Sequence, residues 1–110
     1  MSEKKSEMKL EKKFEMIFCI VNAGFSETVM DAAREAGARG GTIIRARGTA
    51  NQDAEKLFDI AVHSDKEIAM ILVPVEIKDA VLTAVYQAAS TLETRSIAFS
   101  LPVNKTLGLE

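Results

Sequence analysis

Hydrophobic spacing along the chain divides residues 14–103 into six predicted elements. Continuous apolar and β-branched runs are typical of buried strands, alternating runs are typical of edge strands, and apolar residues three or four apart are typical of helices. The predicted order is strand, helix, strand, strand, helix, strand, at residues 14–21, 26–36, 41–47, 66–73, 76–92 and 95–103. A long polar connection, residues 48–65, joins the second strand to the third.

The boundaries and the buried faces of the helices follow from single residues. We expect the Ser26 side chain to cap the first helix, because its oxygen can accept hydrogen bonds from unpaired amides, and Gly37 to end it. The second helix carries one apolar stripe, which predicts its buried face: Ile77, Val81, Val85, Ala88 and Leu92.

This order is the βαββαβ pattern of the ferredoxin-like fold, which belongs to the α+β class. Right-handed crossovers place both helices on one face of a four-stranded antiparallel sheet, with the first and third strands in the middle. Those two strands are the most apolar, as central positions require. The predicted domain spans residues 14–106, and residues 1–13, rich in lysine and glutamate, form a flexible charged tail.

Both central strands are apolar on both faces, although the helices cover only one face of such a sheet. Met16, Phe18 and Ile20 share one face of the first strand, and its odd-numbered residues from 17 to 21 are equally apolar. Each large apolar side chain left in water forgoes roughly 1.5 to 3 kcal/mol of burial. The open face is therefore expected to be an interface between copies of the chain. The alternative is that residues 48–65 fold across it.

Composition narrows the classes of function. A chain of 110 residues with 47% apolar content suits one domain, and a net charge of −2 with one Tyr and no Trp disfavours nucleic acid as a partner. Cys19 cannot form an internal disulfide, and residues 1–13 lack the apolar core of a secretory signal, so we expect a cytoplasmic protein. The apolar runs are too short for a membrane span, so the protein is not expected to be membrane-embedded.

The residue pattern predicts no catalytic residue and no metal site. His63 is the only histidine and has no second metal ligand nearby, and Cys19 is expected to be an inert core thiol. The carboxylates of residues 53–65 lie on a connection rather than on the rigid element that acid–base catalysis needs.

A pair of arginines is the one candidate for ligand chemistry. Arg45 and Arg47, two apart on a strand, project to one side roughly 7 Å from each other. They lead into Gly48, where backbone amides can approach a ligand closely. Such a site can hold a phosphate or carboxylate. The alternative is that the arginines only discourage aggregation of an edge strand.

Residues 40–49, GGTIIRARGT, are followed by a connection, an apolar strand ending in LVP, a helix and a last strand IAFSLPV. In this order, over residues 14–103, the chain resembles the nitrogen-regulatory P-II signalling proteins. The resemblance implies a P-II-like ferredoxin-like domain and a cytoplasmic homotrimer whose open sheet faces line its inner surface. It also implies that adenine nucleotides (ATP, ADP or AMP) bind between subunits. A loop between the second and third strands, the T-loop, would contact a transporter or metabolic enzyme.

The resemblance implies a ligand site that uses both ends of the second strand. The Gly–Thr pair at residues 41–42 would approach the adenine edge, and the pair at residues 48–49 would lie beside phosphate at the base of the T-loop. With the two arginines, the predicted ligand-binding residues are Gly41, Thr42, Arg45, Arg47, Gly48, Thr49 and Gln52.

Three departures from the family pattern limit what the resemblance implies. Residues 90–95, STLETR, stand where the family has a glycine-rich loop with a lysine, which argues against triphosphate binding in the usual manner. Lys105 is the one cation after the last strand, where the family has a basic pair. Tyr86, the sole tyrosine, lies on the second helix rather than in the T-loop. We expect a divergent member that is not an enzyme and senses a small anionic effector, such as an adenine nucleotide with few phosphates.

Three alternatives stay open. A metal-binding trimer resembling the divalent-cation tolerance family has the same fold, although one His and one Cys far apart in sequence argue against it. An acylphosphatase shares the topology, but residues 22–25, NAGF, carry no cation where that enzyme needs an arginine. A structural oligomer without a ligand is compatible with the fold.

Overall fold

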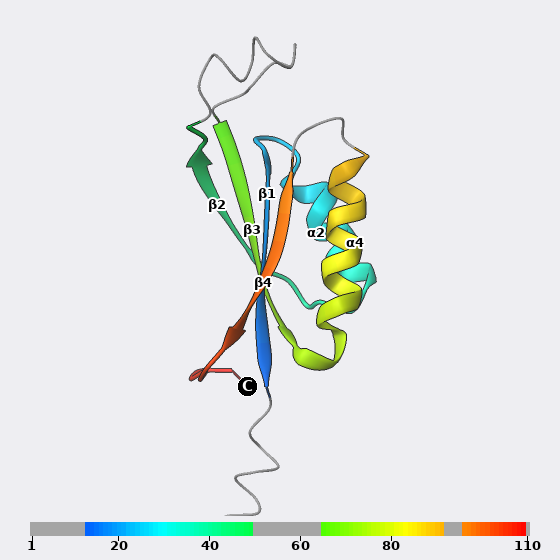
Figure 1. Cartoon of the computed structure of the whole chain (residues 1–110), viewed down its shortest axis with the longest axis vertical. Coiled ribbons are helices and arrows are strands. Elements are labelled where there is room, and N and C mark those ends of the chain that lie inside the picture. The colour runs from blue at the N-terminus through cyan, green and yellow to red at the C-terminus, as the bar shows by residue number, and fades with distance from the viewer. Residues whose placement is uncertain (1–12, 50–64, 92–95, 110) are drawn as a thin grey trace, which may run out of the picture.

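The computed structural model describes residues 13–49, 65–91 and 96–109 (Figure 1). The elements are β1 (Phe14–Asn22), α2 (Ser26–Glu35), β2 (Thr42–Arg47), β3 (Asp65–Pro74), the 3₁₀ turn η1 (Val75–Ile77), α4 (Lys78–Ser90) and β4 (Ile97–Val103). This order confirms the predicted βαββαβ pattern, and the predicted bounds differ from the observed ones by a few residues at most. The predicted tail falls almost entirely on residues 1–12, which lie outside the described residues and so leave that prediction untested.

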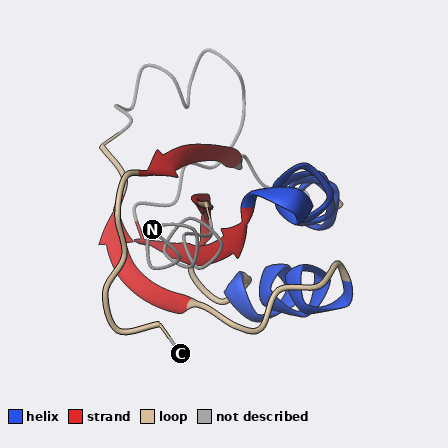
Figure 2. Ribbon diagram, turned by 90° about the horizontal axis from the view of Figure 1, so that it is seen from below, coloured by secondary structure: helices blue, strands red, loops and turns tan. Residues whose placement is uncertain are grey.

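The four strands form one antiparallel sheet in the order β2-β3-β1-β4, which confirms that the first and third strands are central. Both helices lie on the same face of the sheet (Figure 2). In the register, Ile17 of β1 lies opposite Ile71 of β3, and Phe18 lies opposite Phe99 of β4. Because side chains alternate along a strand, odd-numbered residues of β1 and β3 face the helices and even-numbered residues face away from them.

The core lies between this sheet face and the two helices. Its fully buried side chains come from β1, β3, α2 and α4: Ile17, Cys19, Val21, Ala69, Ile71, Val73, Val29, Met30, Ala33, Val81, Val85 and Ala89. The predicted stripe of the second helix is confirmed at Val81 and Val85 but wrong at its next position, where Ala89 is buried and Ala88 only half-buried. The i, i+4 spacing continues from Val85 to Ala89, since four residues bring the chain back to nearly the same side of the helix.

The prediction that Ser26 caps α2 is wrong. The helix begins at Ser26 itself, so Phe25 stands at the N-cap position. The Phe25 side chain makes no capping hydrogen bond. A distant carboxylate caps the helix instead, because Glu67 Oε1 of β3 accepts hydrogen bonds from the Gly24 amide at 3.0 Å and the Ser26 amide at 3.3 Å. This carboxylate also favours the positive end of the helix dipole.

The prediction that Gly37 ends α2 is confirmed. Gly37 has φ of +115°, a left-handed conformation that glycine adopts without steric cost. Its amide donates to the Arg34 carbonyl at 3.0 Å, and the Ala38 amide donates to the Ala33 carbonyl at 2.9 Å. These two bonds are the Schellman arrangement that satisfies the last carbonyls of a helix.

Several predictions fall on residues 50–64 and 92–95, outside the described residues. They concern the body of the connection between β2 and β3, the ligand role of Gln52, the position of His63 and the alternative that residues 48–65 cover the open face.

Candidate functional site

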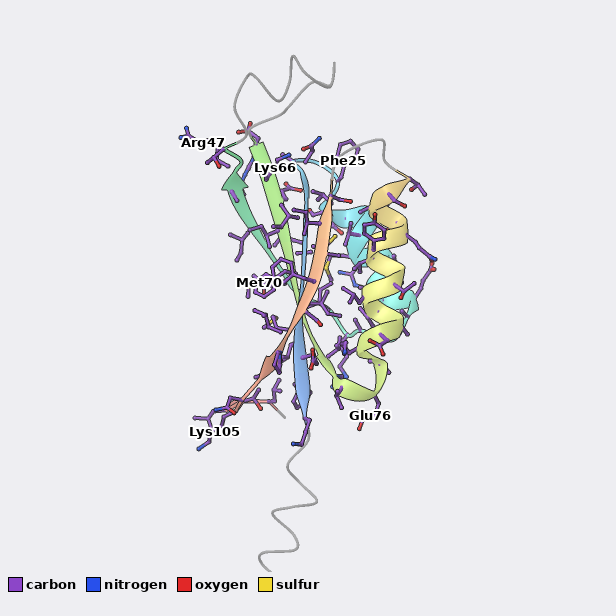
Figure 3. The ribbon with its side chains drawn as sticks, viewed as in Figure 1. Phe25, Arg47, Lys66, Met70, Glu76 and Lys105 are labelled. Atoms are coloured by element: carbon purple, nitrogen blue, oxygen red, sulfur yellow. The ribbon has the colours of Figure 1, made fainter. Side chains whose placement is uncertain are left out.

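The face of the sheet opposite the helices is apolar on all four strands. Its large side chains are Met16, Phe18, Ile20, Ile44, Ile68, Met70, Leu72, Ile97, Phe99 and Leu101. Ile97 is 60% exposed and Leu101 50% exposed, while the rings of Phe18 and Phe99 stack with centroids 5.2 Å apart. Figure 3 shows Met70 on the side of the sheet away from the helices. The sequence-based inference that the second face is apolar therefore holds for the described residues, and both described helices lie on the other side.

The predicted ligand residues divide between the two ends of β2. Thr42 begins the strand opposite Met70, and Arg47 ends it opposite Asp65. At about 3.4 Å per residue these ends lie roughly 17 Å apart. Gly41 and Thr42 are therefore brought together at one end, and Arg47, Gly48 and Thr49 at the other. One copy of the chain cannot place both groups on one small ligand.

The two arginines lie on the helix-facing side of β2, and both are exposed. Their side confirms the alternation expected from the sequence. In the register, however, Arg45 lies opposite Glu67 of β3, and Arg47 lies opposite Asp65. Each guanidinium thus has a carboxylate as its cross-strand neighbour, which lowers the net positive charge of this end of the strand.

Gly41 has a packing role that the sequence did not indicate. A Cβ at this position would lie 2.5 Å from the Met70 carbonyl oxygen and 3.1 Å from Ile71 Cγ1. The start of β2 therefore approaches the β3 backbone more closely than a residue with a side chain allows. The motif Gly40-Gly41-Thr42 is explained at its second glycine by strand packing, independently of any ligand.

A broad groove of about 1570 Å³ lies at the end of the sheet where β2 begins. Gly41, Thr42 and Met70 line it, together with the C-terminal segment after β4. Its charged lining includes Arg39 and Lys105, which come from separate segments of the chain. Arg39 was missed by the sequence-based prediction, although its position beside the Gly-Gly-Thr motif was a usable signal.

Glu67 links β3, β2 and the beginning of α2. The Ser26 side chain and the backbone amides of Gly24 and Ser26 donate to this carboxylate, and the Arg45 guanidinium adds a favourable charge. These contacts outweigh partial burial and hold the pKa of Glu67 below its ordinary value of 4.5. Next to it, Lys66 Nζ donates to Asn22 Oδ1 at 2.6 Å, which fastens β3 to the end of β1.

Replacing Glu67 by glutamine is expected to lower the free energy of unfolding by about 1 kcal/mol at pH 7, the usual loss when a helix cap is weakened. Folding lowers the pKa of the Glu67 carboxylate, so the ionised carboxylate stabilises the folded state. This stabilisation is fully present above the unfolded pKa and is lost as the pH falls through the folded pKa. Urea titrations at pH 7 and pH 3 should therefore show a difference between wild type and Glu67→Gln that shrinks at pH 3. The exposed Glu76→Gln variant is the control, with a change under about 0.5 kcal/mol. An equal difference at both pH values would contradict the role of the charge.

Metal and thiol chemistry find little support in the described residues. Among residues 13–49, 65–91 and 96–109, no group of three or more His, Cys, Asp and Glu side chains could hold a metal ion. Cys19 is fully buried, and desolvation raises the pKa of its thiol to about 11, which keeps it protonated at neutral pH. This agrees with the predicted inert core thiol. In the same part of the chain, neither helix has the length and hydropathy to span a bilayer.

Comparison with known proteins identifies the fold. No protein-family model and no curated protein sequence matches the chain. Among solved structures, Arabidopsis thaliana PII bound to citrate is 26% identical, with a TM-score of 0.64 over 84% of this chain and 79% of that one. A putative PII-like signalling protein from Thermus thermophilus is 15% identical, with a TM-score of 0.64 over 84% and 87% of the two chains.

A third similar structure is a DUF3240 family protein from Shewanella baltica. It is 13% identical, with a TM-score of 0.66, and the match covers 91% of this chain and all of that one. The Thermus and Shewanella likenesses concern the fold alone. With the Arabidopsis structure they confirm the resemblance that the sequence indicated: the chain resembles the P-II-like signalling proteins and shares their ferredoxin-like fold.

Proposed function

We propose that this chain is a homotrimeric, P-II-like regulatory protein of the cytoplasm. It binds a small anionic effector between subunits and signals its presence to a partner protein through residues 48–64, the connection between β2 and β3. The partner is a transporter or metabolic enzyme, and nitrogen metabolism is the first pathway to examine. In this proposal the protein has no catalytic activity of its own.

The observation that carries the proposal is the continuous apolar surface of the open sheet face. Ile97 and Leu101 are at least half exposed there, beside the stacked Phe18 and Phe99 rings. An apolar surface spread over four strands is typical of an interface in a soluble protein. Self-association around a closed axis is the simplest way to bury it, because each copy then covers the same surface of the next.

A seam between copies also accounts for the divided ligand residues. The Gly41–Thr42 end of β2 lines a groove with both apolar and charged side chains, where apolar ones such as Leu72 can contact a planar ring. The Arg47–Thr49 end offers a guanidinium, a flexible glycine and a hydroxyl to an anion. Since the two ends of one strand are too far apart for one small ligand, we assign them to two neighbouring copies.

The charge around the arginines favours an effector with few negative charges. Arg45 and Arg47 each lie opposite a carboxylate in the register, so the positive charge of this end of β2 is partly offset. A mono- or diphosphate of adenosine fits such a site better than a triphosphate does. The solved Arabidopsis PII structure has citrate bound, which adds a small polycarboxylate to the compounds worth testing.

AMP, ADP, ATP, cyclic AMP and citrate should be titrated into the protein, with binding followed by calorimetry and by melting temperature. A ligand at a hundred times its dissociation constant is expected to stabilise the native state by about 2.7 kcal/mol, which raises the melting temperature by several degrees. We expect AMP or ADP to bind more tightly than ATP. Arg47→Gln should weaken binding of that nucleotide about tenfold, since it removes a charged hydrogen-bond donor.

Arg34→Gln is the matched control for the arginine. Arg34 is an exposed arginine on α2 that pairs with Asp31 at 3.2 Å, on another part of the surface. Its loss should leave nucleotide affinity within twofold of wild type. If none of these compounds gives a heat of binding or a thermal shift, the nucleotide and citrate part of the proposal is wrong. If both substitutions weaken binding equally, the ligand binds elsewhere on the surface.

A further inference from the structure

β3 has an unpaired edge along its second half. The strand contains ten residues, and β1 pairs with it along nearly the whole length, from Lys66 to Pro74. β2 pairs only with the first part, because its first residue, Thr42, lies opposite Met70. Residues 71–74 of β3 therefore have a neighbouring strand on one side only.

The backbone groups that face this edge can be identified. A Cβ on Gly41 would lie 2.5 Å from the Met70 oxygen, so the Met70 carbonyl points towards β2. Backbone N–H and C=O groups alternate sides along a strand, which directs those of Leu72 and the carbonyl of Pro74 towards the same, unpaired side. Pro74 has no N–H, so its carbonyl is the last group that this edge offers. An edge of this kind is a template for an added strand.

The edge borders the groove described above, and apolar side chains form part of the groove's lining. Leu72, Val75 and Ile77 line the groove beside it, and Val75 is 39% exposed. The same groove borders residues 104–109, which follow β4 and belong to no helix or strand. This segment carries two leucines in contact with water, Leu107 at 88% and Leu109 at 52% exposure. An unpaired apolar edge and an unpaired apolar segment are thus present in one molecule.

We propose that the β3 edge at residues 71–74 is a strand-addition site whose occupant is the segment at residues 104–109 of a second copy of this chain. Added beside β3, the segment gains hydrogen bonds to Leu72 and places Leu107 against Leu72 and Val75. Six extended residues span roughly 20 Å, enough to cover a four-residue edge of about 13 Å. The proposal rests on the self-association that the proposed function also requires.

The topology favours a second copy over the chain's own segment. Val103 of β4 pairs with Phe14 of β1, so the segment leaves the sheet at the β4 edge. The strand-addition site lies on the β2 side, about three strand spacings or roughly 14 Å away, with the ends of β1 and β3 between them. Crossing this distance uses most of the roughly 20 Å that the segment spans, so the chain's own segment cannot also run along the edge of about 13 Å. Donation from each copy to the next is a head-to-tail contact, which closes into a ring such as a trimer.

Disulfide cross-linking between two variants, each with one added cysteine, tests the proposal directly. Chains carrying Val75→Cys and chains carrying Leu107→Cys should be refolded together and oxidised, and each variant should also be oxidised alone. Cys19 is fully buried, so the native thiol stays silent. We expect disulfide-linked pairs in the mixture and a much smaller amount in either variant alone. Equal amounts in all three samples, or none in the mixture, would overturn the proposal.

A charge introduced at Leu107 provides the second measurement. Leu107→Asp should weaken self-association at least tenfold, while Tyr86→Asp, which adds the same charge at an exposed position on α4 outside the segment, should change it less than twofold. If the open-face variant Phe99→Asp dissociates the assembly and Leu107→Asp does not, strand addition is overturned and assembly through the open face stands. A wild-type protein that is a single chain at micromolar concentration overturns both.

Discussion

Phe99→Asp is expected to convert the assembled protein into folded single chains. Phe99 lies at the middle of β4, an edge strand, and on the open face; it is 39% exposed, with its ring stacked on Phe18. If copies meet on this face, the substitution places a carboxylate in an apolar interface without a partner. Burying an unpaired charge costs several kcal/mol. With about 4 kcal/mol lost per contact, association weakens roughly a thousandfold.

Sedimentation velocity over a concentration series measures this effect, and circular dichroism confirms that the variant is folded. Tyr86→Asp is the matched control, because Tyr86 is also an exposed aromatic residue, 51% exposed, but lies on α4 on the helical side of the molecule. It should leave association unchanged within twofold. Equal association of wild type and Phe99→Asp would show that the open face is not the interface.

Gly41→Ala is expected to lower the free energy of unfolding by about 2 to 3 kcal/mol, a typical cost of forcing an extra carbon into a packed site. The added Cβ would meet the Met70 carbonyl oxygen at 2.5 Å, and this oxygen belongs to the backbone of a central strand and cannot rotate away. Met30 Cε, 3.2 Å from the same position, leaves little space on the helix side. Urea unfolding at fixed protein concentration measures the loss.

Gly40→Ala is the control for Gly41→Ala. No atom lies within 4 Å of a Cβ built at Gly40, so we expect a change within about 1 kcal/mol in either direction. The pair separates packing from ligand binding at the Gly-Gly-Thr motif. If both substitutions change the free energy of unfolding by equally small amounts, the close approach of β2 to β3 is not needed for stability. The ligand role implied by the resemblance would then be the better explanation of Gly41.

The fold could be predicted because its two central strands differ so clearly from the rest of the sequence. Residues 14–21 and 66–73 are apolar on both faces, and only the middle of a sheet suits such strands. The start of α2 could not be predicted in the same way. Its amides bond to Glu67, 41 and 43 residues further along the chain, and local sequence rules consider only nearby candidates such as Ser26.

The candidate site was predicted less completely than the fold. Strand alternation correctly placed Arg45 and Arg47 on one side, but the carboxylates opposite them depend on the register between β2 and β3. That register also sets the 2.5 Å approach at Gly41 and leaves half of one β3 edge unpaired. Strand register is fixed by packing between segments far apart in sequence, so spacing within one segment does not reveal it.

The central claim is that copies of this chain cover the open sheet face of one another. The proposed ligand site lies between subunits, so it exists only if this subunit interface forms. Multi-angle light scattering of the unmodified protein at micromolar concentration tests it most directly. We expect a well-folded species with three times the chain mass of 12.0 kDa. A well-folded species of 12.0 kDa under the same conditions would contradict the claim.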